Sequence, residues 1–189
     1  DELKRSDFNL KEINVSVWNG LMFINFDKRC NSLESIYEKL EKRIDKRNFS
    51  SYQFYKRDSY NISCNWKIYM DNYLEGLHIP IVHPELNKTI NYKSYKTEIH
   101  DQFSLQWCSI DPQLNPYKND SSEDLIAYYV TIFPNVILNI APGRLQTNIV
   151  EPIDEKNCSV HFDYYFEQID EKQIQKDLDF SDIIQREDI

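Results

Sequence analysis

The segment from Asn65 to Leu86, NWKIYMDNYLEGLHIPIVHPEL, constrains this chain more than any other stretch. It holds two of the four histidines, His78 and His83. Apolar residues recur in it at three- and four-residue steps, which predicts an amphipathic helix with one buried side and Asn65 as its N-cap. The residues on the predicted buried side are Trp66, Tyr69, Met70, Tyr73, Leu74 and Leu77.

The spacing of the two histidines requires a break in this helix. On an unbroken helix a step of five residues turns a side chain by roughly 140°, so His78 and His83 could not bind one ion. Pro80 lies between them and cannot continue a helix without losing a backbone hydrogen bond, while Pro84 biases His83 towards an extended backbone. We therefore predict that the helix reaches His78, breaks near Pro80 and swings the two imidazoles together.

The pattern NWK-(x)4-NYLEG-x-H-(x)4-HP resembles the iron-binding segment of the alpha subunit of Rieske-type non-haem iron oxygenases. Within that family it is most similar to the branch of choline and carnitine monooxygenase-like enzymes. The resemblance implies that His78 and His83 are two ligands of a 2-His-1-carboxylate triad on a mononuclear Fe(II) ion. It also implies that Glu75 bridges electron transfer from the Rieske histidine of a neighbouring subunit.

The third ligand of such a triad is a distant aspartate. The residues from Ser181 to Ile189 resemble the family's Q-x-E-D-I segment, in which the ligand corresponds to Asp188. Glu187 and Asp182 compete for this role, but on a helix Glu187 points about 100° away from Asp188. The sequence stops one residue after Asp188, so we expect a shortened helix whose frayed last turn places this carboxylate poorly and weakens iron binding.

Each candidate ligand also has a simpler interpretation. His78 and His83 could be structural histidines, Asp188 a solvated carboxylate at a helix end, and Glu75 an exposed helix residue. The residues that surround the two histidines favour ligation, because they match the family pattern and not only the H-(x)4-H spacing.

Other polar and aromatic residues allow weaker hypotheses. Asp71 and Asn72 are candidates to hold the imidazole tautomers, with capping or surface roles as the alternative. We interpret His100 and His161 as non-ligands. The aromatic residues of the predicted strands are most simply core, although some could form a cation–π cage around a quaternary ammonium group.

The rest of the chain predicts an α+β fold. An Asn19-Gly20 turn predicts a hairpin of residues 15–26, and a helix is expected from Ser32 to Lys46. Further strands are expected at residues 52–64, 103–110, 125–133, 136–141, 144–151 and 158–166, and a last helix at 168–189. The residues from 111 to 123 are expected to form a mobile, variable loop. A sheet of this kind needs one face covered, and the helix that begins after Asn65 and the last helix are the natural covers.

The resemblance specifies this fold and its parts further. It implies a helix-grip (Bet v 1-like or START-like) antiparallel sheet with covering helices. Residues 1–50 would be a lead-in that follows a missing Rieske domain, and residues 51–189 a mononuclear iron catalytic domain truncated at its C-terminal helix.

Charge and composition exclude several classes of partner. The formal net charge of −9 argues against nucleic acid and against an anionic membrane surface, since both favour a basic face. No run of about 18 apolar residues predicts a membrane span, and no signal peptide opens the sequence, so we expect a cytoplasmic protein. Cys30, Cys64, Cys108 and Cys158 are scattered, which predicts free thiols and gives no local pattern for a cysteine-bound cluster.

The resemblance implies an oxidoreductase that is incomplete as this chain alone. The reaction expected is hydroxylation or oxidative N-dealkylation of a small methylammonium compound with O2. Electrons would come from NAD(P)H through a reductase and a Rieske [2Fe–2S] cluster, whose C-x-H…C-x2-H pattern is not found in this sequence. A homotrimer is expected, because electrons cross between subunits in the family.

Two other functions stay open at this stage. The chain could be a catalytically silent helix-grip domain that binds a ligand without iron. It could also be a zinc hydrolase that uses His78 and His83, although HExxH and a general-base glutamate between the histidines are both absent.

Overall fold

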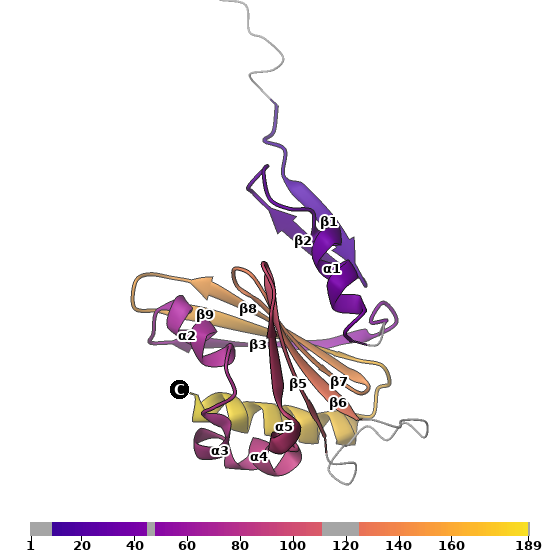
Figure 1. Ribbon diagram of the computed structural model, residues 1–189, viewed down its shortest axis with the longest axis vertical. Helices are drawn as coiled ribbons and strands as arrows, with labels where there is room; N and C mark the ends of the chain where they lie inside the picture. The colour runs from indigo at the N-terminus through magenta and orange to yellow at the C-terminus, as the bar shows by residue number, and fades with distance from the viewer. Residues whose placement is uncertain (1–8, 45–47, 111–124, 189) are drawn as a thin grey trace, which may run out of the picture. The chain divides into compact units, whose positions relative to one another are not determined.

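The computed structural model describes residues 9–44, 48–110 and 125–188 (Figure 1). The chain forms two compact units, residues 1–50 and residues 51–189. The boundary between the units lies at the position where the family resemblance places the end of a lead-in and the start of a catalytic domain. The identity of each unit as lead-in or catalytic domain stays a prediction. The loop predicted at residues 111–123 lies outside the described residues. Within those residues, no helix is long and apolar enough to span a bilayer.

The first unit contains the predicted hairpin. Strand β1 (Asn14–Trp18) pairs with β2 (Leu21–Asn25) in antiparallel register. Asn19 and Gly20 both have positive φ, at 50° and 83°, as a two-residue type I′ turn requires.

One helix accompanies this hairpin. Helix α1 (Leu33–Glu41) begins where the Ser32 side chain accepts a hydrogen bond from the Ser35 N–H, as predicted. It ends at Glu41, before the predicted end at Lys46, which lies outside the described residues. Trp18 donates its indole N–H to Glu41 at 2.8 Å and stacks on Tyr37.

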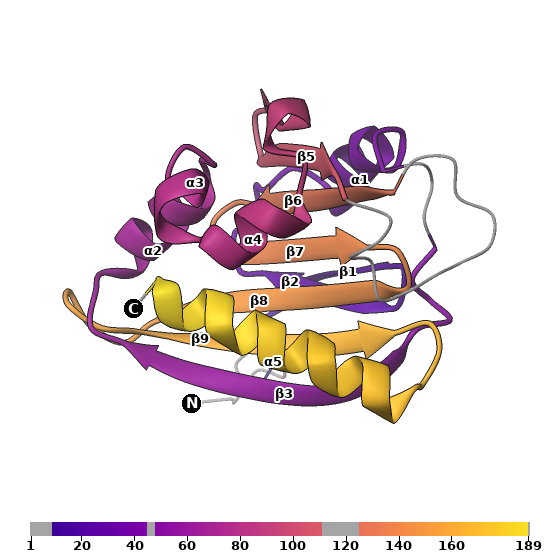
Figure 2. The same cartoon turned by 90° about the horizontal axis from the view of Figure 1, so that it is seen from below.

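The second unit is built on one antiparallel sheet of seven strands, in the order β3-β9-β8-β7-β6-β5-β4 (Figures 1 and 2). The strands are β3 (Gln53–Ile62), β4 (Lys96–Ile99), β5 (Phe103–Ser109), β6 (Ile126–Ile132), β7 (Val136–Ala141), β8 (Arg144–Pro152) and β9 (Cys158–Phe166). The sequence missed β4, whose residues are mostly polar and show no alternation. The predicted α+β fold with an antiparallel sheet is confirmed.

The helices of this unit lie over one face of the sheet (Figure 2). They are α2 (Trp66–Tyr73), α3 (Ile79–Val82), α4 (Pro84–Thr89), the 3-10 turn η2 (Tyr92–Ser94) and α5 (Glu171–Glu187). Alternate residues of β9 form the core beneath them, because Val160, Phe162, Tyr164 and Phe166 are all buried. Ile174 and Leu178 of α5 join the same core cluster. The two predicted covers of the sheet are therefore confirmed.

The helix in the segment from Asn65 to Leu86 ends earlier than predicted. Asn65 caps α2 as expected, but the helix ends at Tyr73 and does not reach His78. Pro80 lies in the first turn of α3, where a proline costs no hydrogen bond. Leu77, predicted to be on the buried side, is 78% exposed.

The turn that follows α2 contains Gly76, well before Pro80. A β-carbon at this position would lie 2.5 Å from Cε1 of Tyr95, so only glycine lets the turn approach that ring. The Glu75 carboxylate accepts a hydrogen bond from the Leu77 N–H and holds this turn. A helical period alone does not reveal such a close approach.

Candidate metal centre

The two histidines flank the four-residue helix α3. His78 precedes it and His83 follows it. The backbone of His83 (φ −116°, ψ 70°) is non-helical but not extended, which differs from the prediction. Their ring centroids are 5.1 Å apart. The break in the helix therefore brings together two imidazoles that an unbroken helix would separate.

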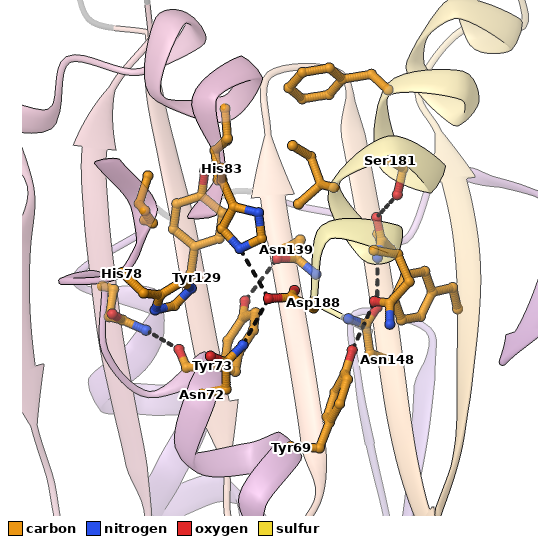
Figure 3. Close-up of a pocket in the computed structure, with 18 of the residues that line it drawn as sticks. Tyr69, Asn72, Tyr73, His78, His83, Tyr129, Asn139, Asn148, Ser181 and Asp188 are labelled. Atoms are coloured by element: carbon orange, nitrogen blue, oxygen red, sulfur yellow. Dashed lines mark hydrogen bonds and ion pairs between the residues drawn. The ribbon is translucent and has the colours of Figure 1, made fainter. Parts of the chain in front are cut away.

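Asp188 reaches the same point from the end of α5. Its Oδ1 lies 3.0 Å from Nε2 of His83 and accepts a hydrogen bond from Nδ2 of Asn72 at 2.9 Å (Figure 3). The expected poor placement of this carboxylate is not what the structure shows. Side-chain contacts hold it, although the helix itself ends at Glu187.

One donor atom each from His78, His83 and Asp188 lie within 4.8 Å of one another. Among the described residues, this is the only group of three or more His, Cys, Asp or Glu side chains close enough to share an ion. Two donors at about 2.1 Å from a metal and at right angles to each other lie about 3 Å apart. The separation between His83 and Asp188 matches that value. Two imidazoles and one carboxylate are also a donor set that suits a divalent metal such as iron.

Each of the two imidazoles has a carboxylate at Nδ1. Glu75 Oε1 lies 2.5 Å from Nδ1 of His78, and Glu187 Oε2 lies 2.9 Å from Nδ1 of His83. Burial tends to raise the pKa of Glu75, but the hydrogen bonds from His78 and the Leu77 N–H outweigh it and lower the pKa. A carboxylate that accepts a hydrogen bond from Nδ1 selects the tautomer in which Nε2 is free to bind a metal.

Asp182 and Glu187, the alternative candidates for the third ligand, make other contacts. Asp182 forms an ion pair with Arg186 at 2.7 Å and accepts a hydrogen bond from Tyr60 at 3.1 Å. Glu187 contacts His83 at Nδ1, on the opposite side of the ring from Asp188. Asn72, predicted to hold an imidazole, holds the Asp188 carboxylate instead.

The two remaining histidines lie outside this group. His100 stacks on Phe103 and lies 3.5 Å from Glu98. His161 is within 2.8 Å of the Ser59 hydroxyl and 3.3 Å of Glu151.

A pocket of about 170 Å³ opens beside the three candidate ligands. Many of the side chains that line it are aromatic: Tyr69, Tyr73, Tyr95, Tyr129, Phe162 and Phe180. Burial raises the pKa values of Tyr73 and Tyr129 well above the ordinary value, so both phenols stay protonated. Tyr73 donates to Asn139 at 2.8 Å. This part of the lining therefore offers a neutral aromatic surface.

Sequence reasoning missed the polar side of this pocket, which β8 supplies. Arg144, Gln146 and Asn148 alternate along the strand and all line the pocket. Gln146 donates to Asn148 at 2.7 Å and accepts from Arg144 and from Ser181. Polar residues at every second position of a strand were the available signal, since they mark one face as polar.

A family model and two curated proteins match this chain. A family model described as ring hydroxylating alpha subunit (catalytic domain) matches residues 49–189. The chain is 34% identical over 139 residues to a chloroplastic choline monooxygenase of Arabidopsis thaliana, covering 70% of this chain and 32% of that protein. It is 25% identical to the carnitine monooxygenase oxygenase subunit of Acinetobacter pittii, over 94% of this chain and 49% of that protein.

Solved structures share the fold. A quaternary ammonium Rieske monooxygenase superposes with a TM-score of 0.79 at 20% identity, over 93% of this chain and 49% of that chain. A naphthalene 1,2-dioxygenase of Rhodococcus sp. gives a TM-score of 0.68 at 19% identity, over 93% of this chain and 50% of that chain. The chain spans from about a third to half of the length of the curated relatives that it matches.

Proposed function

The chain belongs to the ring-hydroxylating alpha subunit family through its catalytic domain, and on that premise we propose that residues 51–189 bind mononuclear Fe(II) and oxidise a small methylammonium compound. The reaction proposed is hydroxylation or oxidative N-dealkylation with O2. The observation that carries this proposal is the convergence of His78, His83 and Asp188 at one edge of an aromatic pocket.

The protein side of the reaction follows from these contacts. Glu75 and Glu187 keep Nδ1 of the two histidines protonated, which points Nε2 at the metal position. Asn72 orients the third ligand. When bound, Fe(II) supplies the redox chemistry that activates O2, and three protein ligands leave positions open for it. The pocket would place the substrate beside those positions.

The substrate class is supported by charge and by the aromatic lining. The carboxylates of Glu75, Glu187 and Asp188 outnumber the two charges of Fe(II), so the site favours a cationic ligand. A methylammonium group also binds well against aromatic faces through cation–π contact. Choline and carnitine, named for the relatives, both carry such a group.

The electron supply is proposed to lie outside this chain. A Rieske [2Fe–2S] cluster on another segment or subunit would deliver electrons that NAD(P)H provides through a reductase. Glu75 suits the proposed bridging role, because its side chain is 42% exposed while it contacts His78. A homotrimer would bring a neighbouring cluster to this residue. The plant relatives are chloroplastic, so a cytoplasmic location stays a prediction.

Metal analysis after anaerobic Fe(II) loading tests this proposal. We expect one iron per chain, lost in His83→Ala and retained in the matched control His161→Ala. Zinc retained together with amidase or peptidase activity would identify a zinc hydrolase instead. A folded protein that retains no metal would be a ligand-binding domain and would contradict the proposal.

A further inference from the structure

Gln185 presents a buried amide to the pocket with one side unpaired. The residue is 4% exposed and lines the pocket beside Asp188. Its Oε1 accepts a hydrogen bond from the Tyr69 hydroxyl at 3.0 Å, but its Nε2 has no hydrogen-bond partner in the described structure. A buried donor without an acceptor costs free energy, so an acceptor supplied by a ligand would be favoured.

The orientation of this amide is set by Tyr69. Burial raises the pKa of Tyr69 far above its ordinary value, so the phenol keeps the proton that it donates to Oε1 of Gln185. With the oxygen held by this bond, the nitrogen points elsewhere. Tyr69 is thus a positioning residue for the free donor.

The free donor lies close to the candidate metal position. Gln185 precedes Asp188 by three residues at the end of α5, which is about 4.5 Å along a helix axis. Both side chains line the same pocket. A small molecule that accepts a hydrogen bond from Gln185 would therefore lie next to the metal.

The charges around the pocket favour a neutral oxygen over a carboxylate as the acceptor for Gln185. Arg144 is the one arginine or lysine among the described residues that line the pocket, and its Nε lies 2.8 Å from Asp177. Both side chains are nearly buried, at 13% and 8% exposure, and Arg144 also donates to Gln146. A ligand carboxylate would add negative charge beside Asp188, and the one lining cation among the described residues, Arg144, already faces Asp177. A neutral oxygen adds no charge.

We propose that Gln185 Nε2 donates a hydrogen bond to a neutral hydroxyl or carbonyl oxygen of the substrate. Under this assignment the pocket selects a small cation that bears such an oxygen over one that ends in an alkyl group or a carboxylate. The inference rests on the proposed function, because it specifies the substrate of that same site.

Binding of matched probes to the full chain tests this assignment. Choline, n-propyltrimethylammonium and γ-butyrobetaine are titrated calorimetrically into anaerobic protein supplied with Fe(II). Choline and n-propyltrimethylammonium share size and charge but differ in the hydroxyl group. We expect choline to bind about three- to tenfold more tightly than n-propyltrimethylammonium, which is the range for one neutral hydrogen bond. γ-Butyrobetaine, which ends in a carboxylate, should bind more weakly than choline.

Variants assign this preference to the amide. Gln185→Met keeps the length of the side chain and removes the donor, so the choline preference should fall to about one. Gln175→Met is the matched control on the same helix, where the exposed Gln175 donates to Asp179, and it should keep the preference. Tyr69→Phe releases the amide and should also reduce the preference, which gives a second test if Gln185→Met does not fold.

The outcomes separate this inference from the proposed function. If the two ammonium probes bind equally, or if choline keeps its preference in folded Gln185→Met, the role of Gln185 is refuted while an ammonium site remains. Where Gln185→Met does not fold, a preference kept in Tyr69→Phe refutes that role. Tighter binding of γ-butyrobetaine than of choline refutes the neutral acceptor. If neither ammonium compound binds, the substrate class fails as well, and the iron content of the same samples reports separately on the metal site.

Discussion

At the scale of single residues, the candidate metal centre depends on contacts between side chains that are far apart in sequence. Glu187 and His83 are separated by 104 positions, and Asn72 and Asp188 by 116. Such contacts orient ligands and raise their basicity. The supporting residues of this site therefore deserve the same tests as its candidate ligands.

Removing the Glu187 carboxylate should weaken metal binding without abolishing it. In Glu187→Ala, Nδ1 of His83 loses its acceptor, so the ring is less well oriented and less basic. We expect the Kd for Fe(II) to rise about 10- to 100-fold. Anaerobic competition with a ferrous chelator measures this change. Asp179→Ala removes an exposed carboxylate on the same helix and should leave the Kd unchanged; an equal effect in both variants would point to general loss of charge.

The sequence predicted which residues form the candidate metal centre. It did not predict all of the contacts that position these residues. His78, His83 and Asp188 were chosen from their motifs, and the structure brings them together. The link between Glu187 and His83 was missed, because helical geometry places Glu187 away from Asp188 and says nothing of a ring that lies between the two. The polar residues of β8 are not evident from sequence, because apolar alternation identifies a strand without showing what its polar face contacts.

At the scale of elements, the turn between α2 and α3 determines where His78 lies. Periodicity predicted one helix up to His78, but α2 ends five residues earlier, at Tyr73. The cause is tertiary: the turn at Gly76 packs against Tyr95, from a segment that a local pattern cannot include. By contrast, β7 and β9 were predicted to the residue, because clear turns bound them and their apolar residues recur regularly.

A methyl group at this turn should be poorly tolerated. In Gly76→Ala the new β-carbon would overlap the Tyr95 ring, and we expect a loss of about 1–3 kcal/mol in the free energy of unfolding. Urea denaturation measures this loss. The double variant Gly76→Ala/Tyr95→Leu should lose less than the sum of the two single variants, because the overlap is removed; strict additivity would show that the ring is not the cause.

The pairing of β3 with β9 includes a further testable contact. Arg57 binds Asp163 through two hydrogen bonds of 2.6 Å, and Asp163 is only 7% exposed. Arg57→Ala leaves that carboxylate buried without these bonds, so we expect the free energy of unfolding to fall by about 1–3 kcal/mol.

The neighbouring residue provides the control. Lys56 pairs with Asp58 on the same strand, and both side chains are substantially exposed. Lys56→Ala should therefore change the free energy of unfolding by no more than about 0.5 kcal/mol. Equal losses in Arg57→Ala and Lys56→Ala would contradict a special role for the Asp163 pair.

At the scale of the whole molecule, the candidate ligands join the helical segment after α2 to the end of α5. Metal that binds only the folded state stabilises it by mass action, by about 2.7 kcal/mol at a free concentration of 100 times the Kd. For a chain of this size, we expect Fe(II) at that concentration to raise the Tm by about 5–11 °C. Anaerobic scanning calorimetry measures the shift, which should vanish in His83→Ala and persist in His161→Ala. A shift of equal size in both variants would place the metal elsewhere.

The long separation between His83 and Asp188 has a consequence for biosynthesis. Ribosomes add about 5–20 residues per second, so the two histidines are made some 5–20 s before the aspartate. Until then the nascent polypeptide offers two imidazoles and lacks the carboxylate that would retain an ion. Under the proposed function, stable metallation is therefore postponed until Asp188 has been translated.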